Sequence, residues 1–226
     1  MYLTRFEINT ARRGARDLLA SPHRLHAAIL AAFPAAHREP SARGRILWRV
    51  DQRSHQTLLY VVSAHQPDLT HLVETAGWPA THTWDTCPYN RLLDQLNPGD
   101  QWAFRLTANP VHSRRKTDTA TRSQRFGHIT VAQQTSWLLD RAGRNGFTIP
   151  EAHGKEPDVA IQARRVWKFT RQGRTVTLAT AVFEGRLEVT DPTALRHALT
   201  HGIGPAKGYG CGLLTLAPLA TPDRHA

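Results

Sequence analysis

The fold of this chain is decided by residues 182–216, which read VFEGRLEVTDPTALRHALTHGIGPAKGYGCGLLTL. Asp191 has the side chain of a helix N-cap and Pro192 suits the first helical position, so a helix is expected from there to Leu199. A short strand over 187–189 precedes this helix. A glycine-rich loop and a last strand over 213–216 follow it. This order of elements is typical of the closing part of a βαββαβ unit.

The rest of the second half completes that unit. We expect a strand over 102–107 and a helix over 131–144 that ends at Gly146. Two further strands, 166–169 and 175–183, flank Gln172 and Gly173, which is a hairpin signal. The basic stretch over 114–125 shows no apolar periodicity and predicts no element.

The first half predicts the order β-α-β-β-α. Strands are expected over 1–9, 45–50 and 57–62, and a short helix over 68–74. A longer helix starts at Ser21 and Pro22 and runs to Phe33. Residues 77–100, rich in proline breaks, are expected to be irregular and to join two domains. The predicted fold class is α+β: tandem ferredoxin-like (RRM-like) βαββαβ domains over 1–98 and 99–226, with a basic β-hairpin in the second.

The charge balance points to a polyanionic partner. The 29 basic residues exceed the 18 acidic ones and give a formal net charge of +11. Only four of the basic residues are lysines, and guanidinium groups bind phosphate oxygens bidentately. A genome that favours arginine codons would also explain the Arg-to-Lys ratio, but it would not explain the net charge.

Several classes of protein are disfavoured by composition. No run of 18 apolar residues is present and the N-terminus has no signal-peptide pattern, so a cytoplasmic protein is expected. Two cysteines far apart, Cys87 and Cys211, argue against a disulfide framework and a cysteine zinc site. We expect no cofactor and no metal, and a monomer when the chain is on its own.

Three sets of residues are candidates for chemistry or binding. Glycines without a Cβ let backbone N–H groups approach a phosphate, although a tight turn alone would also use some of them. The glycine-rich loop holds Gly202, Gly204, Gly208, Gly210 and Gly212, with Lys207 among them. The candidate nucleic-acid ligands outside the loop are Arg12, Arg13, Arg164, Arg165, Lys168, Arg171 and Arg174, for which a solvated surface is the alternative.

The third set is a pair of histidines at a helix start. His23 and His26 are three residues apart, so both imidazoles project from one side of the first turns. A helix N-terminus attracts phosphate, and imidazole can give or take a proton near neutral pH. Two solvated surface histidines remain the alternative, and a zinc site is weaker still because no third ligand accompanies them.

These segments resemble the CasE family, the CRISPR precursor-RNA endoribonucleases of the type I-E Cascade complex within the repeat-associated CRISPR protein superfamily. The specific parts are FEGRLEVTDP at 183–192 and GIGPAKGYGCGLL at 202–214. Residues 2–5, 21–26 and 104–110 extend the resemblance over nearly the whole chain.

The resemblance implies tandem ferredoxin-like domains and metal-independent cleavage at the 3′ base of each repeat stem-loop, with the product kept in Cascade. His26 falls on the family's catalytic histidine, and His23 stands where the family often has tyrosine. The hairpin around 164–174 matches the stem-gripping element by position. The substrate's 2′-hydroxyl would attack the scissile phosphate, leaving a 2′,3′-cyclic phosphate (or 3′-phosphate) and a 5′-hydroxyl. A non-catalytic RNA-binding subunit and a histidine-dependent metal hydrolase are the rival functions.

Overall fold

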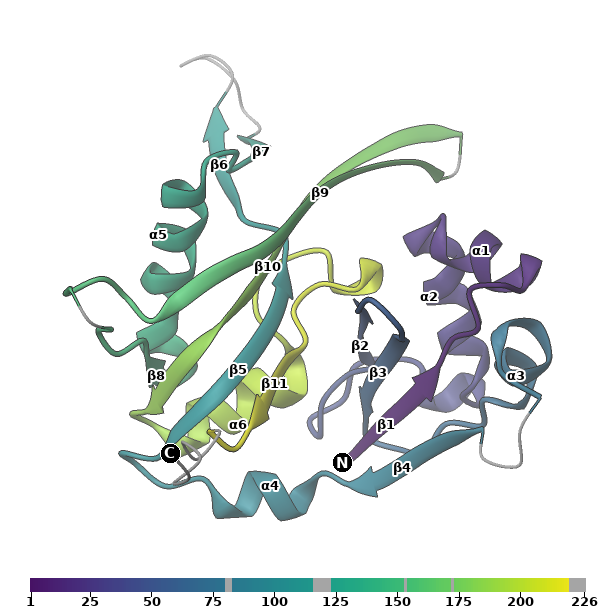
Figure 1. Ribbon diagram of the computed structural model, residues 1–226, viewed down its shortest axis with the longest axis horizontal. Coiled ribbons are helices and arrows are strands. Elements are labelled where there is room, and N and C mark those ends of the chain that lie inside the picture. Colours follow the sequence, from purple (N-terminus) through teal and green to yellow (C-terminus); the bar gives the residue numbers. More distant parts are fainter. Residues whose placement is uncertain (80–82, 116–122, 153, 172, 220–226) are drawn as a thin grey trace.

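The N-terminal part of the computed structural model forms a four-stranded antiparallel sheet. The structure describes residues 1–79, 83–115, 123–152, 154–171 and 173–219. The strands are β1 (Tyr2–Glu7), β2 (Leu47–Gln52), β3 (Thr57–Ser63) and β4 (Trp84–Pro88), in the order β2-β3-β1-β4. The helices α1 (Arg13–Leu19), α2 (Pro22–Ala31) and α3 (Thr70–Ala76), with the short 3₁₀ turn η1 (Ala35–His37), complete this part (Figure 1).

Alternation along β2 gives this sheet two different buried faces. Trp48 belongs to the core formed with α1, α2 and α3, while Leu47 belongs to the core of the second sheet. The first sheet therefore lies between its own helices and the second sheet (Figure 1).

The second sheet repeats the strand order of the first. Its strands are β5 (Gln101–Ala108), β8 (Phe147–Thr148), β9 (Val159–Arg171), β10 (Arg174–Val189) and β11 (Leu214–Ala217). The order is β11-β5-β10-β8, with β9 paired to β10, and every pairing is antiparallel. Two helices, α5 (Val131–Ala142) and α6 (Pro192–His201), and the turns η2 (Gly143–Asn145) and η3 (Lys207–Tyr209) connect them. Each sheet thus has the strand order of a ferredoxin-like βαββαβ unit, which agrees with the fold class predicted from the sequence.

Helix caps form where the sequence placed them. The Ser21 hydroxyl accepts a hydrogen bond from the Arg24 N–H, and the Asp191 carboxylate accepts from the backbone of Thr193 and Ala194. Thr130, which the sequence analysis did not single out, starts α5 with a reciprocal capping box.

Several predicted boundaries are wrong. Residues 77–100 contain β4 and α4 (Asn90–Gln95), because the apolar side chains Leu93 and Leu96 are taken into the core of the second sheet. Residues 187–189 are the end of the long strand β10 and not a separate strand, since β10 pairs with β5 along 181–188. The helix α1, over part of the arginine cluster, was not predicted.

The hairpin and the basic stretch are also more extended than predicted. The pairing of β9 with β10 runs from the pair Val159–Gly185 to the pair Arg171–Arg174, with one register shift. Figure 1 shows this hairpin extending from the second sheet toward the side that carries α1 and α2. The predicted irregular basic stretch holds β6 (Val111–Arg115) and β7 (Ser123–Gly127), which pair with each other. Residues 116–122 of that stretch, Gln172 of the predicted turn and residues 220–226 lie outside the described residues.

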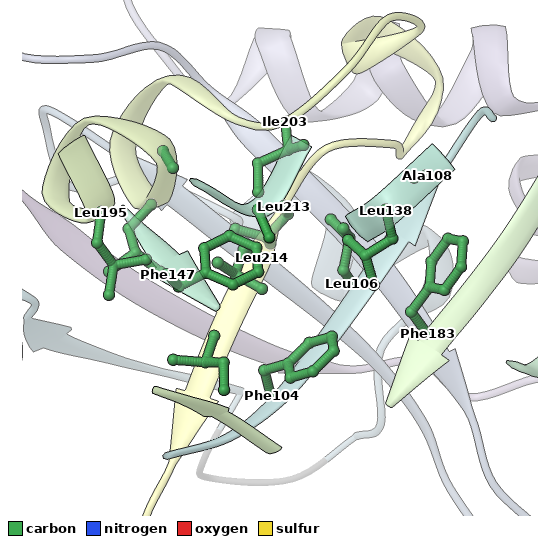
Figure 2. Close-up of a cluster of buried hydrophobic side chains, with 14 of the residues drawn as sticks. Phe104, Leu106, Ala108, Leu138, Phe147, Phe183, Leu195, Ile203, Leu213 and Leu214 are labelled. Carbon is green, nitrogen blue, oxygen red and sulfur yellow. The ribbon is translucent and has the colours of Figure 1, made fainter. Parts of the chain in front are cut away.

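One hydrophobic core joins the two sheets. Leu47 and Val62 from the first sheet pack with Phe104, Leu106 and Leu214 from the second. Figure 2 shows Ile203 and Leu213, at the two ends of the glycine-rich loop, in this same cluster. The loop is therefore anchored in the core at both ends. The domain boundary between residues 98 and 99 stays a prediction.

Candidate active site

The structure brings the predicted histidine pair and the glycine-rich loop together. A cavity of about 630 Å³ lies between the start of α2 and the loop that follows α6. Its polar lining comes from four separate segments: His23, His26, Arg45, Arg171, Lys207 and Tyr209. Segments nearly 190 residues apart in sequence therefore share one cavity across the two domains.

His26 is half-buried, and a residue of strand β2 contacts its ring. The indole N–H of Trp48 donates a hydrogen bond to Nδ1 of His26 over 3.2 Å, and the two rings lie nearly parallel, with their centroids 6.4 Å apart and an interplanar angle of 20°. Because Trp48 is only 3% exposed, this contact lies at the edge of the N-terminal core.

Two glycines let the loop lie directly on this ring pair. A Cβ at Gly208 would stand 3.2 Å from Nε2 of His26, and a Cβ at Gly210 would stand 2.7 Å from the Trp48 ring. Gly210 also has φ of +79°, which side chains rarely adopt. These two glycines therefore serve the close approach of loop to histidine, in addition to any role in holding phosphate.

The charges around His26 all have the same sign. Burial lowers the pKa of His26 first, and the nearby His23, Arg45 and Arg171 lower it further. Burial and Arg45 also lower the pKa of Lys207, whose ammonium group donates to the Gly204 carbonyl over 2.6 Å. No carboxylate is among the described residues that line the cavity. The cavity is therefore suited to an anion.

The hairpin reaches the cavity through one arginine. Arg171 near the end of β9 donates to the Tyr209 hydroxyl over 2.9 Å, and Phe169 meets the Tyr209 ring edge-on at 5.0 Å. The hairpin is thus fixed to the glycine-rich loop at Tyr209, beside His26.

A family model for proteins described as "CRISPR associated protein" matches residues 1–218. The chain is 31% identical to the CRISPR-associated endoribonuclease Cse3 of Thermus thermophilus, over 96% of this chain and all of that one. It is also 31% identical to the Cascade subunit CasE of Escherichia coli, over 97% of this chain and all of that one. The chain belongs to the CasE family.

Solved structures agree with this assignment. The structure of Cse3 bound to a 19-nucleotide RNA matches with a TM-score of 0.79, over 96% of this chain and all of that one, at 31% identity. Thermus thermophilus Cse3 bound to an RNA representing a pre-cleavage complex matches with a TM-score of 0.77 at 31% identity, over 96% and 98% of the two chains. The CasE-family assignment thus rests on sequence and fold together.

The predicted RNA ligands of this CasE-family chain fall into three groups. Arg171 and Lys207 line the cavity. Arg164, Arg165, Lys168 and Arg174 are exposed along the hairpin, with Arg165 stacked over the Trp167 ring at 3.5 Å and Arg164 donating to the Ile129 carbonyl. Arg12 and Arg13 lie at the start of α1 and do not line the cavity.

Arg12 has a structural role that the sequence did not suggest. Its guanidinium donates to the carbonyls of Val73, Glu74 and Gly77 and so satisfies the end of α3. Arg13 is exposed and stands 4.0 Å from Asp17. Binding of RNA by these two residues stays a prediction.

Sequence reasoning missed three residues of the site. Arg45 and Trp48 belong to a segment predicted only as a strand, and Tyr209 was quoted only as part of the loop. The alternation along β2 could have placed Trp48 on the helix side, but it could not have paired that ring with His26. Alternation along a strand shows on which face of the sheet a side chain lies, but it does not show which residue that side chain contacts.

The described part of the chain gives little support to a metal site, a cysteine nucleophile or a membrane-spanning helix. No group of three His, Cys, Asp or Glu residues able to hold a metal ion occurs there. Burial raises the pKa of the Cys211 thiol to about 12, so this thiol is a poor nucleophile, and Cys87 is exposed and free. No described helix is long and apolar enough to cross a membrane.

Proposed function

We propose that this chain is an endoribonuclease that cuts CRISPR precursor RNA at the 3′ base of the repeat stem-loop and retains the mature guide RNA as a subunit of Cascade. It acts in the cytoplasm, without a metal ion. The support from relatives is that Cse3 is named an endoribonuclease and has been solved with RNA, and that CasE is named a Cascade subunit.

The observation that carries the proposal is the enclosed imidazole of His26 in a cationic cavity. RNA carries its own nucleophile, so the site must align the 2′-hydroxyl with the scissile phosphate and move two protons. The 2′-oxygen forms a bond to phosphorus after losing its proton to a base, for which His23 on the same cavity wall is the candidate. The bond from phosphorus to the 5′-oxygen breaks, and His26 protonates that oxygen. The products are a 2′,3′-cyclic phosphate (or 3′-phosphate) and a 5′-hydroxyl.

The hairpin supplies the second argument, because it places like charges opposite each other. Arg171 and Arg174 are directly paired across β9 and β10, an arrangement that is destabilising unless an anion lies nearby. A phosphate of the RNA stem would remove this repulsion. Arg171 belongs to both the hairpin and the cavity, which supports a binding mode in which the hairpin holds the stem and the base of the stem lies at His26.

The test is cleavage of a synthetic repeat hairpin in EDTA, with analysis of the product ends. The unchanged protein is expected to cut once and to leave the end groups given above. His26→Ala should lower the single-turnover rate by roughly 10²–10⁴-fold while leaving RNA affinity nearly unchanged. His55→Ala is the matched control, because His55 is exposed and does not line the cavity.

Each alternative function gives a different result. Salt-sensitive binding of the hairpin without any cutting would mean a non-catalytic RNA-binding subunit. Cutting that needs Mg²⁺, or that survives His26→Ala at the full rate, would contradict the proposed mechanism.

A further inference from the structure

Trp48 makes its hydrogen bond to Nδ1 of His26 and not to Nε2. Its indole N–H can only donate, so the hydrogen bond to Nδ1 requires a free electron pair on that atom. A neutral imidazole carries one hydrogen, which must then be on Nε2. Nε2 is also the atom nearest to Gly208 in the loop, where the cavity lies.

The hydrogen bond has a consequence for the charged form of the ring. A protonated Nδ1 is itself a donor and cannot accept from the indole. Gaining a second proton therefore costs His26 its bond to Trp48, in a place where Trp48 is held by the core and by Gly210. The imidazolium is destabilised in this way, in addition to the effects of burial and neighbouring charges.

We propose that Trp48 is a positioning residue that turns Nε2 of His26 toward the cavity and opposes a proton on Nδ1, so that the His26 cation, the acid for the 5′-oxygen of the RNA, forms when the RNA phosphate is bound. The proposal rests on the proposed function, since it assumes that His26 protonates the leaving group. The bond acts on the share of His26 that is protonated, because the cation and the ring that has just given up its Nε2 proton both carry a hydrogen on Nδ1 and cannot accept from the indole.

The proton balance is as follows. His26 enters the reaction as a cation with hydrogens on both nitrogens. When the bond from phosphorus to the 5′-oxygen breaks, its electron pair stays on the oxygen, which takes the proton from Nε2. The ring is left neutral with its hydrogen on Nδ1. Exchange with water then moves that hydrogen to Nε2, and the bond to Trp48 is restored.

The groups that face His26 explain when the cation forms. His23 lies on α2 itself, Arg45 lies on the segment before β2, Arg171 lies on β9, and Lys207 and Tyr209 belong to the loop. The charged groups among them are cations, which oppose a proton on His26. The phosphate of bound RNA is the anion that favours it, so the acid is loaded in the presence of substrate.

The first experiment is a titration of the free protein by ¹⁵N NMR of the histidine rings. In the unchanged protein, neutral His26 is expected to show a bare Nδ1 and a protonated Nε2. Trp48→Phe keeps an aromatic ring at this buried position and removes the donor together with part of the ring volume. It should shift the protonation equilibrium of His26 toward the cation by roughly 2- to 10-fold, the effect of one hydrogen bond. A neutral form protonated on Nδ1, or an unchanged titration in the variant, would overturn the proposal.

The second experiment is the pH profile of single-turnover cleavage. In Trp48→Phe the alkaline limb, where the acid loses its proton, should move to higher pH. If the rate falls but the alkaline limb of the pH profile does not move, Trp48 has only a structural role and the proposal is wrong. Trp137→Phe is the matched control, because Trp137 packs under Gly204 of the same loop without contacting His26. The NMR result does not depend on cleavage, so failure of the proposed function would be recognised separately.

Discussion

At the scale of single residues, the site depends on a histidine kept neutral by its surroundings. Burial lowers the pKa of His26 relative to an unfolded chain, and His23 and the two cations Arg45 and Arg171 lower it further. Below about pH 6.5, the unfolded state therefore binds more protons at this residue than the folded state does. The stability that His26 contributes is present above that pH and is lost as the pH falls.

The corresponding prediction concerns stability in acid. The free energy of unfolding should fall between pH 7.5 and pH 5.5, and His26→Asn should make this fall shallower because it removes the titrating group. Urea unfolding at the two pH values measures the effect. His55→Asn, at an exposed position, should leave the pH dependence as it is. An equally steep fall in His26→Asn would contradict the role of burial at this residue.

At the scale of elements, the hairpin β9–β10 and the glycine-rich loop act as one unit. Tyr209 joins them through Arg171 and Phe169. The hairpin presents its arginines as an extended ribbon, and such a ribbon binds an RNA backbone mainly by charge. Contacts of this kind change affinity without changing which sequence is preferred.

The prediction for the hairpin is a change in salt dependence. Arg174→Gln removes one exposed cation from the end of the hairpin. It should weaken binding of the repeat RNA at every salt concentration and reduce the slope of log K against log salt by about 1. Filter binding at several salt concentrations measures this slope. Arg91→Gln on α4, which lies apart from the hairpin in Figure 1, should leave the slope unchanged. Equal slopes in both variants would exclude Arg174 as a phosphate contact.

At the scale of the whole molecule, a buried ion network fixes one sheet against the other. The guanidinium of Arg49 binds both oxygens of Asp51 at 2.7 and 2.9 Å, and it also donates to the carbonyls of Arg105 on β5 and of Leu213, the residue before β11. Arg105 binds Asp51 at 3.1 Å and pairs with Glu184 on β10. Both Arg49 and Asp51 are only 2% exposed.

The prediction for this network compares two carboxylates. Asp51→Asn leaves two arginines without their buried counter-charge and should cost about 3–5 kcal/mol of stability. Asp85→Asn breaks the pair with Arg5, whose side chains are 57% and 60% exposed, and should cost about 0–1 kcal/mol. Denaturant unfolding measures both changes. Similar losses in the two variants would mean that the network does not hold the sheets together. Because the cavity is built from both domains, Asp51→Asn should also slow RNA cleavage.

The sequence by itself determined the features that depend on neighbours along the chain. The cap residues Ser21 and Asp191 and the prolines after them start helices where predicted, because capping involves only three or four consecutive residues. The glycine-rich segment and the family were also recognisable from consecutive residues. The elements within residues 77–100 could not be recognised from the sequence, because α4 depends on Leu93 and Leu96 packing into a core built by other parts of the chain.

Only the tertiary structure decided which side chains meet. Trp48 and His26 are 22 residues apart, Arg171 and Tyr209 are 38 apart, and Arg49 and Leu213 are 164 apart. No local pattern records these pairs, since strand alternation assigns a face but not the residue across from it. The histidine was visible in the sequence. The environment that sets its acidity exists only where the two domains close on each other.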